Sequence, residues 1–427
     1  MSRLRTLIRV DIRIDQRWAI GAAPDLVFRP QRRDASEAER VTRLPVQKDP
    51  GGDVLLPTTS LTGSLARHLG DQADKWLGSA EEETTVPSQL RCLAANVHDA
   101  TSTEITTTAI DAGRRAPKAN MLRTEEVLDP CLVTWWLEWD HHDAGLRLDD
   151  LMTRLKLWRP IIGRRRSADR GRAHVAAIHH KTVDLAETDD LTWWLGTRHC
   201  IDWTSDKPPS GPGWHCEKGG TSLTGDSPVL RCRFEVVDAL HIGGAGISED
   251  DDGHQVTETG DTLPSTSWRG IFRHRARHIV QMRTGDAGLA DRADQVVARL
   301  FGSGREAGAS QQAGHRGQLR FADSPVSGGR ILRTHVAIDR ISGGAAQLTT
   351  PDGVDGEGLL FNLKCYGPGA TLELAIYNDS DRPVEAGDRE LLRQVIRDLD
   401  EGLIGVGGMT SRGYGTLRRI DEIEEGS

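Results

Sequence analysis

Apolar and polar residues alternate in two stretches, one at the start of the chain and one past its middle. The first stretch covers residues 4–14 and the second covers residues 229–237. A period of two residues is the spacing of a half-buried β-strand. In both places a glycine-bearing loop follows, and then a Leu-Pro sequence that leads into Ser and Thr residues, which can cap a helix. We therefore expect each half of the chain to begin with a strand followed by a helix.

The second half carries further periodic segments. Residues 267–282 and 388–399 have apolar residues at helical spacing, whereas residues 317–322, 370–377 and 415–420 have the pattern of strands. Strands combined with two helices in each half predict an α+β fold of the split βαβ, or ferredoxin-like, type.

Four short motifs occur twice and in the same order. The paired segments are 18–23 with 240–246, 56–63 with 263–270, 109–113 with 337–343, and 162–171 with 404–413. One pair alone would be weak, but an ordered set of four indicates an internal repeat. A single large domain with chance matches is the alternative.

The repeat predicts a division into two domains. Residues 205–228 are rich in Pro, Gly and Ser, which is typical of a linker. We therefore expect a first domain over residues 1–204, a linker over 205–228 and a second domain over 229–427. The total length of 427 residues fits two domains of ordinary size.

Charge and cysteine content narrow the class of protein. The chain has 54 Lys and Arg against 63 Asp and Glu, a net charge of −9. This balance does not exclude a nucleic-acid partner, because the clustering of basic residues matters more than their total. No apolar run approaches the roughly 20 residues of a membrane span, and the charged N-terminus does not resemble a signal peptide. Six cysteines without a CxxC pair favour reduced thiols, and we expect a cytoplasmic protein without a membrane partner.

The glycine-rich segment 405–415 is the first candidate binding element. Glycine permits positive φ angles and close backbone approach, so exposed amides there could hold phosphate oxygens. Arg412 would add a charge-assisted contact. The candidate residues in this segment are Gly407, Gly408, Ser411, Arg412 and Tyr414. A tight structural turn is the alternative, and the segment lacks the Gly-Lys-Ser/Thr of a Walker loop.

Basic residues gather at the matching places of the repeat. The segment that corresponds to 405–415 in the first half has lost glycines and gained Arg164, Arg165, Arg166 and Arg170. The two Pro-led helix starts add Ser60, Gly63, Ser267, Arg269 and Arg273. Arginines on a helix with a capped N-terminus suit a phosphodiester backbone, although a solvated helix face is the alternative.

An acidic loop is the candidate for chemistry. Four adjacent acids occupy residues 249–252 and could bind Mg²⁺ or activate a 2′-hydroxyl. A flexible, solvated loop is the alternative. The His-Cys pairs at 199–200 and 215–216 do not follow the usual spacing of zinc ligands, so we assign no metal site to them.

Taken together, these motifs resemble the RAMP superfamily, the RNA-binding backbone proteins of type III CRISPR effector complexes. The resemblance rests on residues 241–246, 263–270, 300–302, 337–342 and 405–415, with a looser match in the first half. It implies a tandem, two-domain backbone subunit with a ferredoxin-like fold in each half. It also implies crRNA held along the glycine-rich loop and the first helix, with target RNA and other effector subunits as partners.

The resemblance also suggests a catalytic residue. RNA-cleaving members carry an Asp just upstream of a Pro-Val element. In the first half Arg43 stands at that place, ahead of Pro45-Val46; in the second half Asp252, with Asp251 next, is the best match. Target-RNA cleavage by the second domain, with Mg²⁺ as a candidate cofactor, is therefore an open expectation. Two alternatives remain: a crRNA-processing endoribonuclease that uses His241 or Tyr414, and a structural capping subunit without chemistry.

Overall fold

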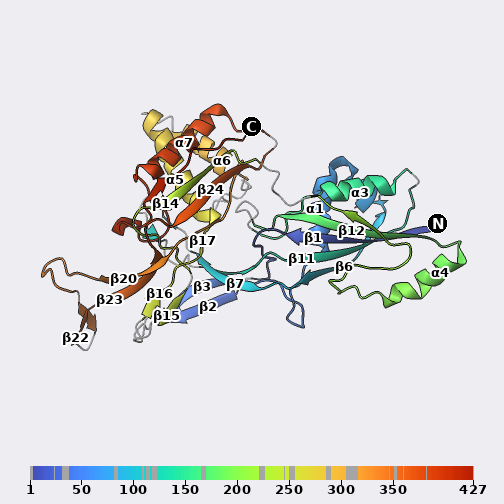
Figure 1. Ribbon diagram of the computed structural model, residues 1–427, viewed down its shortest axis with the longest axis horizontal. Helices are drawn as coiled ribbons and strands as arrows, with labels where there is room; N and C mark the ends of the chain where they lie inside the picture. Colours follow the sequence, from blue (N-terminus) through green and yellow to red (C-terminus); the bar gives the residue numbers. More distant parts are fainter. Residues whose placement is uncertain are drawn as a thin grey trace. The chain divides into compact units, whose positions relative to one another are not determined.

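The computed structural model describes most of the chain and divides it into two compact units (Figure 1). Unit 1 comprises Met1–Glu104, Ala119–Arg166 and Arg170–Gly225, and unit 2 comprises Ile105–Lys118, Ser167–Asp169 and Asp226–Ser427. The described residues are 3–23, 25–30, 38–80, 85–107, 110–111, 116–117, 123–143, 145–164, 170–220, 227–244, 246–249, 255–284, 290–303, 316–345, 347–350, 353–358, 360–380 and 382–426.

Unit 1 is built on an antiparallel sheet with the strand order β13-β12-β1-β11-β6. Its strands are β1 (Leu4–Ile14), β6 (Leu90–His98), β11 (Leu132–Trp139), β12 (Ala173–Asp184) and β13 (His215–Lys218). Two helices, α1 (Thr58–Leu69) and α3 (Leu148–Leu157), lie on one side of this sheet (Figure 1). Their leucines share one apolar cluster with the isoleucines of β1. Burial of that apolar surface is the main stabilising contribution of this layer.

Unit 2 has an antiparallel four-stranded sheet with the order β18-β24-β14-β25. Its strands are β14 (Leu230–Val236), β18 (Leu319–Phe321), β24 (Thr371–Asn378) and β25 (Leu417–Arg419). The helices α5 (Ser265–Thr284), α6 (Ala290–Phe301) and α7 (Ala386–Asp400) pack their apolar side chains against it. Trp268 and Phe272 of α5 are fully buried in this core.

Each unit carries a second four-stranded sheet. In the first half of the chain the order is β2-β3-β10-β7, from β2 (Asp25–Pro30), β3 (Ala38–Leu44), β7 (Ser102–Thr107) and β10 (Arg123–Leu128); the last three residues of β7 fall in the segment assigned to unit 2. In unit 2 the order is β15-β16-β23-β20, from β15 (Ile247–Glu249), β16 (Gln255–Thr257), β20 (Arg330–Val336) and β23 (Leu360–Tyr366). The pairs β3–β10 and β16–β23 are both parallel, so the two second sheets share one arrangement.

Short elements complete the chain. The remaining strand pairs are β4 (Ser79–Ala80) with β5 (Thr85–Val86), β8 (Ile110–Asp111) with β9 (Ala116–Pro117), β17 (Thr262–Leu263) with β19 (Ser324–Pro325), and β21 (Gln347–Thr350) with β22 (Gly353–Gly358). The remaining helices are α2 (Ala73–Leu77) and α4 (Thr188–Leu195), with 3₁₀ turns η1 (Gly70–Gln72), η3 (Thr197–Cys200) and η5 (Thr410–Arg412). Among the described residues, no helix combines the length and the apolar composition needed to cross a membrane.

The order of elements is the same in the two central sheets. In unit 1 the chain runs β1, α1, β6, β11, α3, β12, and in unit 2 it runs β14, α5, β18, β24, α7, β25. The strand orders β6-β11-β1-β12 and β18-β24-β14-β25 correspond position by position. The opening strands predicted from the alternating pattern therefore occupy the same place in both sheets. The mixture of helices and antiparallel sheets agrees with the predicted α+β class.

The expectation of a half-buried first strand holds in unit 2 but is wrong in unit 1. β14 alternates between buried and more exposed residues, whereas β1 is buried on both faces over most of its length. The second face of β1 is covered from the far side by α4 and the coil after it (Figure 1). Arg9 of β1 donates hydrogen bonds to the carbonyls of Ser205, Asp206 and Lys207, and its guanidinium lies 5.7 Å from the Trp136 ring centroid.

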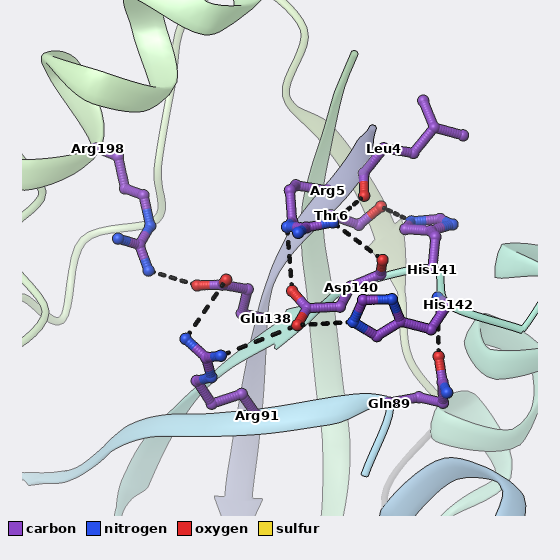
Figure 2. Close-up of polar contacts among 10 residues, drawn as sticks. All are labelled: Leu4, Arg5, Thr6, Gln89, Arg91, Glu138, Asp140, His141, His142 and Arg198. Carbon is purple, nitrogen blue, oxygen red and sulfur yellow. Dashed lines mark hydrogen bonds and ion pairs between the residues drawn. The ribbon is translucent and has the colours of Figure 1, made fainter. Parts of the chain in front are cut away.

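A network of ion pairs holds the segment after α4 against the central sheet of unit 1 (Figure 2). Arg198 of η3 pairs with the buried Glu138 of β11. Arg91 lies 3.9 Å from both Glu138 and Asp140, and Arg5 lies 3.1 Å from Asp140. A buried carboxylate needs such partners because its desolvation is otherwise unfavourable. The network therefore has a structural explanation: it holds the 3₁₀ turn against β11.

The first part of the predicted linker belongs to unit 1. Residues 215–218 form β13, which pairs with β12 at the edge of the central sheet. Lys181 of β12 donates a hydrogen bond of 2.7 Å to the Pro212 carbonyl, which holds the preceding coil as well. The Pro- and Gly-rich composition of this stretch therefore reflects tight turns on a surface rather than a free connection. Residues 221–226 of the predicted linker lie outside the described residues.

Candidate functional site

The glycine-rich loop, residues 405–415, connects the region after α7 to β25 in unit 2. It is closed by a hydrogen bond of 3.0 Å from the Val406 amide to the Gly415 carbonyl. Two further bonds join it to the segment after β14: the Gly408 amide donates to His241 (2.8 Å) and the Gly415 amide donates to Ala239 (2.7 Å). The loop is therefore held in one conformation by main-chain contacts, independently of any ligand.

Two of its glycines are required by backbone geometry. Gly407 has a φ of 79°, and a Cβ there would lie 2.5 Å from the His241 carbonyl oxygen. Gly415 has a φ of 77°, and a Cβ there would lie 1.9 Å from the Val406 carbonyl oxygen. The structural-turn interpretation thus explains Gly407 and Gly415. The Gly408 amide is already bonded to His241, so the predicted phosphate contact of that amide has no free donor in this conformation.

The exposed part of the loop is the 3₁₀ turn η5, which carries Ser411 and Arg412. Both residues are exposed, and the Arg412 guanidinium lies over the Phe361 ring at 5.3 Å from its centroid. Within the part of the chain that the structure describes, no carboxylate forms an ion pair with Arg412. Arg412 therefore keeps its charge available at the surface of a rigid loop.

Behind Arg412 lies a row of aromatic rings, here called the aromatic ladder: Phe361, His335 and Tyr414. The Phe361 and His335 rings are nearly parallel, at 20° and with centroids 5.2 Å apart. His335 Nε2 and the Tyr414 hydroxyl form a hydrogen bond of 2.6 Å. Phe361 and His335 are half-buried, whereas Tyr414 is buried. The ladder therefore runs from the surface inward.

The inner end of the ladder is fixed by charge. Arg333 lies 5.7 Å from the Tyr414 ring centroid and forms a two-pronged ion pair with Asp238, at 2.6 and 3.1 Å. Burial raises the pKa of the Tyr414 hydroxyl, which keeps it protonated at neutral pH. Sequence analysis did not single out Phe361, His335 or Arg333. The alternating pattern of β20, which places Arg333 and His335 on one face, was the available signal.

The matching loop of unit 1 repeats the same main-chain contacts. The Ile162 amide donates to Gly171 (2.8 Å), the Gly171 amide donates to Arg17 (3.0 Å), and the Arg164 amide donates to Ala19 (3.0 Å). Ile162 and Gly171 therefore correspond to Val406 and Gly415. The sequence comparison, which paired Ile162 with Ile404 and Gly171 with Gly413, was displaced by two residues in this loop.

The predicted basic residues of the unit 1 loop have internal partners. Arg164 lies 3.0 Å from Glu125 and donates a hydrogen bond of 2.7 Å to the Leu44 carbonyl, and Arg170 lies 2.7 Å from Glu125. Glu125 is 0% exposed and Arg170 is 6% exposed. Burial lowers the pKa of Arg164 while the Glu125 charge opposes this shift. The two arginines thus neutralise a buried carboxylate; Arg165 and Arg166 lie outside the described residues.

The two Pro-led helix starts are confirmed as α1 and α5. The Ser60 amide donates to Pro57 and the Ser267 amide donates to Pro264, at 2.9 and 2.8 Å, so both serines lie in equivalent first turns. Gly63 is exposed with open space around it. Arg273 is exposed, whereas Arg269 is turned inward and donates to the Phe301 carbonyl. Burial lowers the pKa of Arg269.

The proposed catalytic residues Asp251 and Asp252 lie outside the described residues. Their assignment stays a prediction, and the neighbouring strands bear only on the counterpart of Arg43. The Gln47 amide donates to Ile20, as the Gly260 amide donates to Ile242, so Arg43 corresponds to Val256 and not to a residue near 253. Arg43 lies 2.8 Å from Glu104.

Residues invoked by the alternative functions are buried. His241 shares a 3.0 Å hydrogen bond with the Lys364 carbonyl through Nδ1, and Tyr414 is bonded to His335. Neither side chain is placed to meet a substrate in this conformation. Cys200 and Cys216 are exposed free thiols, and the described residues contain no cluster of His, Cys, Asp and Glu suited to a metal ion.

Comparison with known proteins bears on the part of the chain that contains the glycine-rich loop. No curated protein matches the chain. Residues 233–418, from β14 to β25, match the family model of the RAMP superfamily. The match includes α5, the aromatic ladder and the whole of the loop, and it supports membership of the RAMP superfamily for this second part of the chain.

Proposed function

We propose that the chain is a crRNA-binding backbone subunit of a type III CRISPR effector complex, made of two ferredoxin-like RAMP domains. The family match of residues 233–418 supports an RNA-binding, CRISPR-associated role. The common strand orders β6-β11-β1-β12 and β18-β24-β14-β25, each with two helices, support a ferredoxin-like domain in each unit. Target RNA and other effector subunits are the further proposed partners.

One observation carries the assignment of the RNA contact to unit 2. Arg412 is exposed on a loop that main-chain bonds hold rigid, and no described carboxylate neutralises it. In the matching loop of unit 1, Arg164 and Arg170 both face Glu125. A phosphate at the unit 1 loop would have to compete with a buried carboxylate, whereas at Arg412 it would compete with no described carboxylate. Ser411 beside it offers a hydroxyl donor.

The test is a salt titration of RNA affinity. Labelled single-stranded RNA is titrated with the wild-type protein and with Arg412→Ala, and affinity is followed by fluorescence anisotropy at several salt concentrations. Loss of one phosphate contact should make the log–log slope shallower by about 0.7. Arg393→Ala is the matched control, because Arg393 lies on α7 and pairs with Glu390 and Glu425 at 3.0 and 2.5 Å. Equal slopes for both variants would remove Arg412 from the RNA contact.

Target-RNA cleavage remains a separate part of the proposal. Asp252, or Asp251 beside it, would accept the 2′-hydroxyl proton or hold Mg²⁺ near the departing oxygen. In a reconstituted complex, Asp252→Ala should abolish one cleavage position while RNA binding is retained, and removal of Mg²⁺ should have the same effect on that position. If Asp252→Ala and Asp251→Ala both leave every fragment at the wild-type rate, the acidic loop is not catalytic.

A further inference from the structure

The aromatic ladder extends the proposed RNA contact from phosphate to base. We propose that Phe361 and His335 form a stacking platform for one unstacked nucleobase of single-stranded RNA, with the Arg412 guanidinium 5.3 Å from the Phe361 ring centroid. The proposal rests on the proposed function, since it takes RNA to be the ligand of the glycine-rich loop. It adds a base-contacting site to the phosphate contact of Arg412.

The position of the platform follows from strand register. Phe361 of β23 and His335 of β20 are direct partners in the antiparallel pair, so their side chains leave the same face of the sheet. Farther along that face of β23, Leu363 and Cys365 are buried in a small core with Tyr414, and Met409 packs against it. The loop therefore covers one end of this face, and Phe361 and His335 lie where the cover ends. A purely internal pair would be buried like Leu363, whereas these two rings stay half-buried.

The platform is held in place before any ligand binds. The 2.6 Å hydrogen bond to Tyr414 fixes the plane of the His335 ring, and the Phe361 ring lies 20° from that plane. Tyr414 is in turn packed beneath Arg333, which Asp238 holds by two hydrogen bonds. A surface that is already rigid loses little conformational freedom when a base stacks on it.

The exposed end of the aromatic ladder is suited to binding a nucleobase of single-stranded RNA. Half-exposed aromatic rings stack with any base because every base has a π face, and an adjacent arginine can stack on the base or reach its phosphate. In unit 1 the position of Phe361 is occupied by Arg123. Arg43 and Val256 correspond, and their partners in the parallel strand pairs are Thr124 and Asn362. The residues that precede these partners, Arg123 and Phe361, therefore correspond as well. The position in unit 1 that corresponds to Phe361 therefore offers no aromatic ring for stacking.

The experiment combines Phe361 variants with RNA that lacks single bases. Phe361→Ala should weaken binding of single-stranded RNA roughly ten- to hundredfold and leave the salt slope unchanged, because the stacking term is not ionic. Phe361→Trp should restore most of the affinity. Leu332→Ala is the matched control, since Leu332 is a 50% exposed residue on the other face of β20. Thermal unfolding of each variant shows that it is folded.

The experiments with abasic RNA decide whether the protein contacts a base. One abasic position in a scanned series should weaken wild-type binding as much as Phe361→Ala does, and the two changes together should cause no further loss. The stacking proposal is overturned if Phe361→Ala binds like the wild type, or if the two losses add at every position. If either result is found while the wild-type protein still binds RNA with salt-dependent affinity, the proposed function stands and only the stacking proposal fails. A wild-type protein that binds no RNA overturns both.

Discussion

The Tyr414 hydroxyl and His335 Nε2 form a 2.6 Å hydrogen bond that links the glycine-rich loop to β20. Tyr414 belongs to a loop that the sequence marks by its glycines, while His335 belongs to a strand 79 residues earlier. The bond therefore couples the main-chain geometry of the loop to the orientation of a half-buried ring at the surface.

Removal of this hydroxyl should loosen the loop without disturbing the core. Tyr414→Phe should lower the free energy of unfolding of unit 2 by about 1 kcal/mol, the usual net contribution of a buried hydrogen bond. Urea unfolding measures the change. Tyr366→Phe is the control, because the hydrogen bond that the Tyr366 hydroxyl accepts from Arg330 is long, at 3.4 Å. An equal loss in the two variants would mean that the short bond to His335 has no special weight.

Glu125 should be important for the stability of unit 1. Glu125→Gln removes the carboxylate that Arg164 and Arg170 share and leaves the buried Arg170 without its counter-charge. Breaking a buried ion pair on one side costs about 3–5 kcal/mol. Denaturant unfolding followed by tryptophan fluorescence reports on unit 1, because all of the 11 tryptophans except Trp268 precede residue 226.

The control for Glu125→Gln is Glu104→Gln, at the exposed pair with Arg43. That change should cost less than about 1 kcal/mol because solvent screens the pair. If the two variants are equally stable, Arg164 and Arg170 do not depend on Glu125. Both arginines would then be available to RNA, as the sequence suggested.

Alanine substitutions at Gly415 and Gly413 should distinguish a steric clash of the new Cβ from the strain of a left-handed backbone. Gly415→Ala places a Cβ 1.9 Å from the Val406 carbonyl oxygen, which forces the main chain to move. Gly413→Ala, at a φ of 87° but with open space, adds only the cost of a left-handed conformation, about 1–2 kcal/mol. We expect Gly415→Ala to lower the melting temperature of unit 2 well beyond Gly413→Ala. Similar melting temperatures would contradict the rigid closure of the loop.

Unit 1 should lose stability in mild acid. Partial or full burial lowers the pKa of His98, His141 and His180, for His141 to about 4. The unfolded chain takes up protons at a pKa of about 6.5, so it binds more protons than the folded chain at pH 5. This contribution to stability is complete above pH 6.5 and declines as the pH falls toward 4.

Urea unfolding at several pH values, read by tryptophan fluorescence, measures this decline. His141→Asn should make the unfolding midpoint depend less on pH, because His141 has the largest of these pKa shifts. Its ring stacks on that of Trp139, with the centroids 3.6 Å apart. A midpoint that stays constant between pH 7 and pH 5 would contradict the neutral state of these rings in the folded unit.

Local patterns in the sequence were sufficient for the main elements of both halves. Residues 4–14 form β1 at the expected bounds, and the helix expected over 267–282 is α5 with two more residues at each end. The paired Leu-Pro segments lead into α1 and α5. These features depend on neighbours close in the chain: alternation of apolar residues, proline at a helix start and glycine at positive φ. The order of the repeated motifs also came from the sequence alone.

The tertiary structure decided which of these residues face the solvent. The repeated motifs pair Arg170 with Arg412 in sequence, but of these two only Arg170 forms an ion pair with Glu125, which β10 brings in. β1 has the same alternation as β14, yet a helix and coil more than 170 residues later bury its polar face. His335 meets Phe361 because β20 pairs with β23 in one particular register. Burial and charge pairing depend on partners that are distant in sequence, and a short-range pattern contains no information about which partners folding will bring together.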